Sequence, residues 1–268
     1  MTGLIVPPYF LRVGWAHENL ELIRSEVQSW CGTNPYMVTP VVEDDQNLCR
    51  VNFPTSVPLI IVREVSYFCH NLRSAMDYMA TALVSPNPQG HNRNPQFPLF
   101  WDGVWDETPQ GKPAQKTKAR NNWERYTAGM PPKAITILKG LQPQKAARNT
   151  PTEIYRLFAL YELWNEDKHR QLPTIEPGIF NCKVLWTNPD GQRTWTRFVP
   201  EATLVKDNAA FVIPDTAMDV EVSGSVDVAV RLAEPKGYVP LVGYFENVLR
   251  SVRELVIDPL HPIAAGIP

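Results

Sequence analysis

The chain lacks long hydrophobic runs and has only four cysteines. No apolar segment approaches the roughly 18 residues that a membrane-spanning helix requires, so no membrane association is expected. The first residues, MTGLIVPPYFLRV, have no basic segment before their short apolar patch, which argues against a secretory signal and favours a cytoplasmic protein. The cysteines are far apart and form no C-x-x-C pair, so we expect reduced thiols and no zinc site.

Sequence signatures of common enzymes are missing as well. The chain has no phosphate-cradling glycine loop, no H-E-x-x-H, no G-x-S-x-G and no dinucleotide fingerprint. We therefore predict no metal and no cofactor. An enzyme acting on a small molecule without these motifs remains open.

What the sequence does contain is typical of a globular protein. Of 268 residues, 44% are hydrophobic and 20% are charged, which is outside the disordered range. The net charge of −2 hides an asymmetry, because residues 112–148 carry nine basic residues and one acidic residue, a net charge of +8. Aromatic residues such as Trp123 lie among them, close to Arg120. This composition suits a phosphate backbone with stackable bases, although a solvated connecting lobe would have it too.

Hydrophobic periodicity predicts an α+β fold. Helices are expected at 18–30, 58–84, 134–141, 152–170 and 239–257, and strands at 36–44, 47–53, 182–187, 193–199, 209–214 and 218–233. Residues 86–134 are interpreted as a long irregular excursion. We expect one interlocked domain over 1–268; the alternative separates a mainly helical part, 1–172, from strands and a C-terminal amphipathic helix, 173–268.

Two of these helices have polar residues that need an explanation. On the helix at 58–84, an apolar face opposes a polar face with His70, Arg73 and Asp77, and Asn71 is adjacent. The helix at 152–170 has more than one apolar side, which indicates that it is surrounded by protein. Its last residues are nevertheless polar.

The stretch LYELWNEDKHR, residues 160–170, places Asn165, Lys168 and His169 on an apolar face, followed by Arg170. Buried polar groups need partners, so we predict that Arg73 and Asp77 lie opposite them. Such a cluster either fixes how two helices pack or forms a general acid/base with cations for an anionic ligand.

Four motifs carry a resemblance: HNLRSAMDYMATAL, FPLF, LQPQ and LYELWNEDKHR. In this order they resemble a family of uncharacterised bacterial and phage proteins, and the likeness covers roughly residues 58–172. More loosely, the helical part is similar to HEPN domains, the helical bundles of many toxin and defence ribonucleases. The fold implied is a HEPN-like bundle combined with an antiparallel sheet and a C-terminal amphipathic helix.

The HEPN resemblance implies a metal-independent ribonuclease site formed by a dimer. His169 matches the histidine of that motif and Asn165 the polar residue that follows its arginine. Trp164 occupies the arginine position, so Arg73 would supply the cation from the other helix.

Two functional hypotheses follow. In the first, the protein binds or cleaves RNA, or binds another anionic ligand. The catalytic set is then His169, Arg73, Asn165, Asp77 and Lys168, and the substrate-binding set is Arg170, His70, Asn71, Trp123 and Arg120. In the second, the protein is a non-enzymatic factor that binds another protein, and the Arg/Asp/Asn/His cluster is structural.

Overall fold

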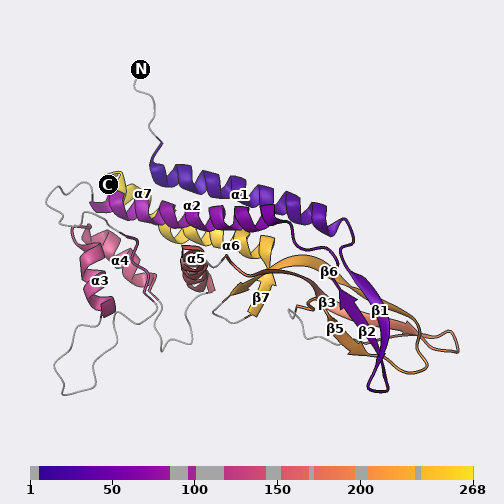
Figure 1. Cartoon of the computed structure of the whole chain (residues 1–268). Helices are drawn as coiled ribbons and strands as arrows, with labels where there is room; N and C mark the ends of the chain where they lie inside the picture. The colour runs from indigo at the N-terminus through magenta and orange to yellow at the C-terminus, as the bar shows by residue number, and fades with distance from the viewer. Residues whose placement is uncertain are drawn as a thin grey trace, which may run out of the picture. The chain divides into compact units, whose positions relative to one another are not determined.

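The computed structural model describes residues 6–84, 96–100, 118–142, 152–168, 172–196, 204–232 and 237–267 (Figure 1). Its helices are α1 (Pro8–Cys31), α2 (Leu59–Val84), α3 (Lys118–Thr127), α4 (Pro132–Gly140), α5 (Thr152–Lys168), α6 (Leu241–Val252) and α7 (Asp258–Ala264), with a π-helix at Arg253–Ile257 between the last two. Its strands are β1 (Met37–Glu43), β2 (Gln46–Asn52), β3 (Ile175–Thr187), β4 (Arg193–Thr196), β5 (Ala209–Val212), β6 (Met218–Leu232) and β7 (Gly237–Pro240). The predicted α+β class is confirmed.

The chain groups into two compact units. The first contains residues 1–20, 66–171 and 245–268, and the second contains residues 21–65 and 172–244. Each unit is thus assembled from segments that are distant in the sequence. Neither unit coincides with the expected parts 1–172 and 173–268, because 21–65 and 245–268 fall on the other side of that division.

The described part of the first unit is helical. Its core includes Phe68 and Leu72 of α2, Leu157 of α5 and Phe245 of α6, all fully buried. The rings of Phe68 and Phe245 are stacked at 4.6 Å between centroids. In Figure 1, α2 lies between α1 and α6. The apolar face predicted for α2 is therefore confirmed as core.

The second unit contains two antiparallel sheets. One has the strand order β1-β2-β5 and the other the order β4-β3-β6-β7. Both predicted hairpins are present, β1–β2 and β3–β4. The β3–β6 register shifts between Phe180 and Lys183, where Asn181 has a φ of 54°. Asparagine tolerates this left-handed conformation better than most residues, so it suits a bulge.

The C-terminal helix differs from its prediction at one turn. The predicted stripe of Leu241, Phe245, Val248 and Val252 is buried. The π-helix at Arg253–Ile257 then adds a residue to the turn, so Val256 and Leu260 continue the buried stripe and Leu255 is only half-buried.

Three elements were not predicted. The helix α3 lies inside the expected excursion at 86–134, and it is a short, strongly polar helix. The strand β7 includes residues 239 and 240, which were assigned to the start of the last helix, and α7 extends that helix beyond residue 257. In addition, α1 begins ten residues before the expected start at residue 18.

Candidate functional site

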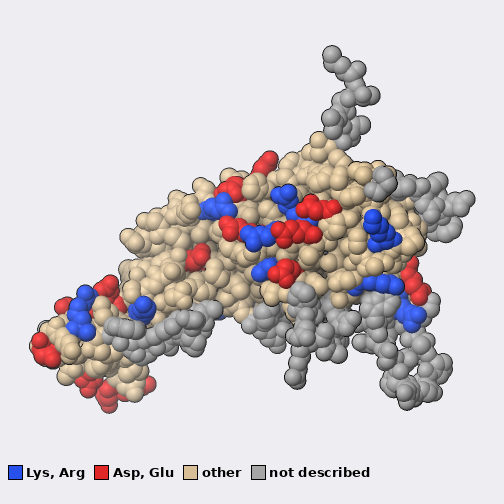
Figure 2. Space-filling model, turned by 180° about the vertical axis from the view of Figure 1, so that it is seen from behind, with Lys and Arg blue, Asp and Glu red and all other residues tan. Residues whose placement is uncertain are grey.

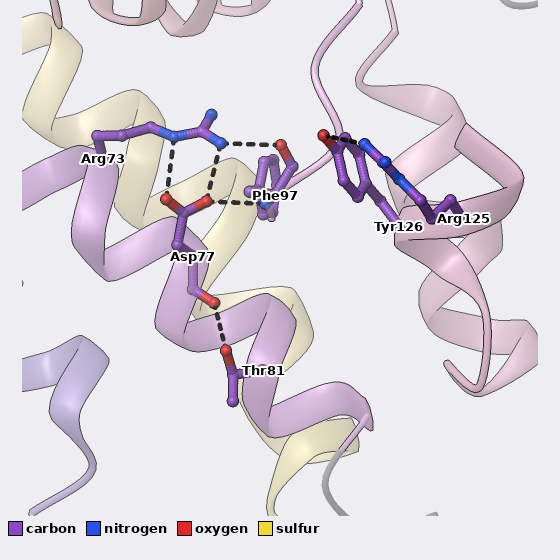
Figure 3. Close-up of polar contacts among 6 residues, drawn as sticks. All are labelled: Arg73, Asp77, Thr81, Phe97, Arg125 and Tyr126. Carbon is purple, nitrogen blue, oxygen red and sulfur yellow. Dashed lines mark hydrogen bonds and ion pairs between the residues drawn. The ribbon is translucent and has the colours of Figure 1, made fainter. Parts of the chain in front are cut away.

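Arg73 is the centre of the candidate site. Helix α2 places it one turn before Asp77, and the two side chains form a forked ion pair (Figure 3). Nε of Arg73 donates to Oδ2 of Asp77 at 3.2 Å, and Nη2 donates to Oδ1 at 2.8 Å. The Arg73 side chain is only 3% exposed, in agreement with the prediction that it faces the inside of the protein. Burying this cation is tolerated because the carboxylate lies directly against it.

The ion pair holds the backbone of Phe97. The N–H of Phe97 donates to Oδ1 of Asp77 at 2.8 Å, and Nη2 of Arg73 donates to the carbonyl oxygen of Phe97 at 3.2 Å. Phe97 belongs to an irregular segment, residues 96–100, whose backbone has no helix or strand partners. Buried backbone groups must be paired, and here the side chains of α2 provide the partners.

Gln142 holds the other end of the 96–100 segment. Its Oε1 accepts a hydrogen bond from the N–H of Phe100 at 3.0 Å. Its Nε2 donates to the carbonyl oxygens of Pro98, at 2.7 Å, and of Leu138 in α4, at 3.0 Å. The motif that contains Gln142, LQPQ, is one of the four that carry the family resemblance, but nothing in the sequence indicates this contact, because it depends on the path of residues 96–100.

Helix α5 contributes aromatic rings to the site. The guanidinium carbon of Arg73 lies 5.1 Å from the ring centroid of Tyr161 and 5.3 Å from that of Trp164. These are cation–π distances. Helices α2 and α5 therefore meet at Arg73 as predicted, but the contact from α5 is made by aromatic rings and not by polar side chains. Nη1 of Arg73 is buried and has no hydrogen-bond partner in the described part of the chain.

The polar residues expected at the end of α5 are placed as follows. Asn165 is half-buried, and no hydrogen bond joins it to Arg73 or Asp77 within the described segments, which corrects the predicted pairing. Lys168 is exposed and its Nζ lies 4.9 Å from the ring centroid of Trp164. The predicted residues His169 and Arg170 lie outside the described residues.

Two predicted residues of α2 have surroundings that differ from those of Arg73. His70 is exposed. Asn71 is buried and points toward α1, where it accepts a hydrogen bond from Nη1 of Arg12 at 2.8 Å and donates to Oδ1 of Asn19 at 3.0 Å. The expected single polar face of α2 is therefore divided between two neighbouring elements.

The aromatic residues of the basic segment also differ from the expectation. Trp123 is 4% exposed and packs in the core, so its indole is not available to stack on a base. Tyr126 is half-buried, and its ring is nearly parallel to the Phe100 ring, with 6.0 Å between the centroids. The guanidinium carbon of Arg125 lies 4.6 Å from the centroid of the Tyr126 ring. Nη2 of Arg125 also donates to the Tyr126 hydroxyl at 2.7 Å, as Figure 3 shows.

The helices α3 and α4 form a locally basic surface. Of their basic residues whose side chains are described, four are exposed, Arg120, Arg125, Lys133 and Lys139, while Glu124 is the one acidic residue between positions 118 and 142. Arg120 forms an ion pair with Glu124 at 3.6 Å. By contrast, on the face drawn in Figure 2 acidic and basic side chains lie beside one another over the middle of the surface.

The cysteines do not offer a nucleophile in the described segments. All four are free thiols, as predicted. Burial, assisted by Asp227, raises the pKa of Cys31 to about 11, and burial with nearby Cys49 raises the pKa of Cys182 to about 11. Burial also raises the pKa of Cys69 strongly. These thiols are protonated at neutral pH, whereas a reactive cysteine needs a lowered pKa.

Comparison of the chain with family models, with curated proteins and with solved structures finds no match. Within the described residues, no three histidine, cysteine or acidic side chains come together to hold a metal ion. The described helices include none with the length and apolarity needed to cross a bilayer.

Proposed function

We propose that the protein binds RNA through the exposed basic residues of α3 and α4, and that the Arg73–Asp77 pair is structural. The observation that carries this proposal is the set of hydrogen bonds that the Arg73–Asp77 pair makes. Both carboxylate oxygens of Asp77 and two of the three guanidinium nitrogens of Arg73 bind each other or the Phe97 backbone. Little of the pair remains for a substrate, and its contacts fix the 96–100 segment.

The 96–100 segment links this pair to the basic surface. Gln142 and the Arg73–Asp77 pair hold its backbone, and its last residue, Phe100, lies flat against Tyr126 of α3. The guanidinium of Arg125 also lies over the Tyr126 ring. A guanidinium fixed in this way can bind phosphate through its N–H groups or stack against a base.

The likeness to HEPN domains is consistent with an RNA partner, and membership of a HEPN-like family forms part of the proposal. The order of the motifs supports it. Three of the four motifs supply the hydrogen bonds of Asp77 with Phe97 and of Gln142 with Pro98, and the fourth supplies the rings near Arg73.

The test is a variant in which Arg120, Arg125, Lys133 and Lys139 are all replaced by glutamine. We expect it to bind a single-stranded RNA about a hundredfold more weakly than the wild type at low salt, because four phosphate contacts are lost. Fluorescence anisotropy with a labelled oligonucleotide measures the dissociation constant.

A matched control removes the same charge from the second unit, by replacing Arg24, Lys183, Arg193 and Arg231 with glutamine. Affinity within a few-fold of the wild type is expected for this variant. Equal losses in both variants, or no loss in either, would show that α3 and α4 are not the contact surface. If the wild type does not bind RNA but binds another protein, the alternative of a non-enzymatic protein-binding factor would be favoured instead.

A second candidate function is a metal-independent ribonuclease. The observation that favours it is Nη1 of Arg73, a buried cationic donor with no partner in the described part of the chain. Such donors are rare in folded proteins, and a phosphate oxygen would satisfy this one. In this candidate Arg73 stabilises the phosphate and His169 is the acid/base.

The ribonuclease candidate predicts that the wild type shortens single-stranded RNA in the presence of EDTA and that His169→Ala abolishes the cleavage. If Arg73 has only a structural role, the RNA should stay intact with the wild type and with His169→Ala. Gel analysis of an end-labelled RNA separates the two outcomes. The variant must retain the melting temperature of the wild type, so that loss of cleavage is not loss of folding.

A further inference from the structure

Arg12 of α1 belongs to a second polar cluster, distinct from the Arg73 cluster. Its Nη1 donates to Oδ1 of Asn71, and Nδ2 of Asn71 donates to Oδ1 of Asn19. Asn71 is only 9% exposed, so the amide that holds Arg12 is itself fixed by burial and by a hydrogen bond. All three residues belong to the first unit.

Two aromatic rings flank the guanidinium of Arg12. Its central carbon lies 4.9 Å from the ring centroid of Trp15 and 5.9 Å from that of Tyr78. Both rings are nevertheless open to solvent, since Trp15 is 44% exposed and Tyr78 is 42% exposed. An arginine held by an amide and two rings has lost most of its conformational freedom before any ligand arrives.

Within the part of the chain that the structure describes, the charge of Arg12 is not compensated. Among the described residues no carboxylate forms an ion pair with it, whereas Arg24, on the same helix, pairs with Glu21, and Arg73 pairs with Asp77. A neutral asparagine orients the guanidinium without cancelling its charge. The remaining N–H groups of the fork are therefore available to an anion of matching geometry, such as a phosphate.

We propose that Arg12, Trp15 and Tyr78 form a binding site for a single-stranded nucleic acid segment, with a phosphate on Arg12 and a base stacked on an exposed ring. Stacking is tolerant of sequence because every base has an aromatic face, so the site contributes affinity without base selection. Trp, Tyr and Arg also recur in protein interfaces. The uncompensated, pre-oriented cation favours the polyanion over a protein surface.

This inference rests on the proposed function for the class of partner, and it adds a contact that the basic helices do not provide. A strand bound at both places would be longer than one bound at α3 and α4 alone. We therefore expect short oligonucleotides to be less sensitive to changes at Arg12 than long ones.

The test compares Trp15→Ala, Trp15→Phe and Arg12→Gln with the wild type on a labelled single-stranded RNA of about 20 nucleotides. Trp15→Ala is expected to raise the dissociation constant about tenfold, and Trp15→Phe by less than threefold because a ring remains. Arg12→Gln should raise it about fivefold and reduce the slope of log affinity against log salt by about 0.7, the value for one phosphate contact on a single strand.

Arg24→Gln is the matched control, since it removes an arginine of α1 that is paired with a carboxylate, and no change in affinity is expected. The exposed position of Trp15 keeps the variants folded, which their melting temperatures check.

If the wild type binds RNA and α3–α4 variants weaken that binding while the Trp15 and Arg12 variants do not, this inference fails alone. If the wild type binds no single strand, both proposals fail. A change in sedimentation with Trp15→Ala and unchanged RNA affinity would assign the rings to contact between copies of the chain, which also overturns the inference.

A single-stranded DNA of the same sequence and a duplex RNA complete the experiment. Equal binding of the DNA is expected, because a stacked base and a phosphate carry no information on the sugar. The duplex should bind at least tenfold more weakly, since its bases are not free to stack on protein rings. Duplex binding as tight as single-strand binding would overturn the stacking at Trp15 and Tyr78.

Discussion

Replacing Asp77 with alanine is expected to lower the free energy of unfolding by about 3 kcal/mol, because it leaves the buried Arg73 guanidinium without its carboxylate. The N–H of Phe97 also loses its acceptor. Urea denaturation followed by circular dichroism measures the change. The 96–100 segment should be released at the same time, which faster proteolysis within it would detect.

Two controls separate the causes of this loss. Asp77→Asn keeps an acceptor for Phe97 but removes the charge, so we expect an intermediate loss. Glu124→Ala removes the acid of an ion pair with the same i,i+4 spacing on α3, where both side chains are about half exposed. Surface pairs contribute little, so a loss below about 0.5 kcal/mol is expected there. If Asp77→Ala were as mild as Glu124→Ala, the Arg73–Asp77 pair would not stabilise the fold.

The second large effect is expected at Gly224 of β6. A Cβ atom there would lie 2.7 Å from the carbonyl oxygen of Phe180 and closer still to Cγ2 of Ile179. Both neighbours come directly before the β3 bulge, and the contact with Phe180 is a backbone contact, so the backbone must move to admit a methyl group. Gly224→Ala should therefore lower the free energy of unfolding by about 3 kcal/mol.

Gly14 of α1 provides the opposite case. A Cβ atom at Gly14 meets nothing within 4 Å, and alanine is a better helix former than glycine. Gly14→Ala should raise the free energy of unfolding by about 0.5–1 kcal/mol, measured in the same urea experiment. If Gly224→Ala raised the free energy of unfolding, β3 and β6 would not approach each other as closely at the bulge as described here.

Local patterns in the sequence were sufficient for most helices and strands. The spacing of Ile61, Phe68 and Leu83 identified the core face of α2, and the Asn-Pro-Asp-Gly turn identified the β3–β4 hairpin. The π-helix after Val252 could not be foreseen, because no residue pattern marks the extra residue in its turn. The helix α3 was missed because it is short and polar, so that tertiary contacts rather than an apolar stripe maintain it.

The candidate site was predictable only in part. Helical spacing correctly placed Arg73 and Asp77 on one side of α2, facing α5, but a helical wheel cannot indicate that residues 96–100 lie against this pair. The same limitation hid the burial of Trp123. The cluster at Arg12 cannot be predicted from the sequence, because the rings, the amide and the lack of a carboxylate partner among the described residues are properties of the folded chain.

The salt dependence of RNA binding by the wild type is the most direct test of the proposal that this protein holds RNA through phosphate contacts. Four basic residues on α3 and α4 together with Arg12 predict a slope of about −3.5 in a plot of log affinity against log salt, with the RNA recovered intact. A slope near zero, or RNA that is shortened during the titration, would contradict it.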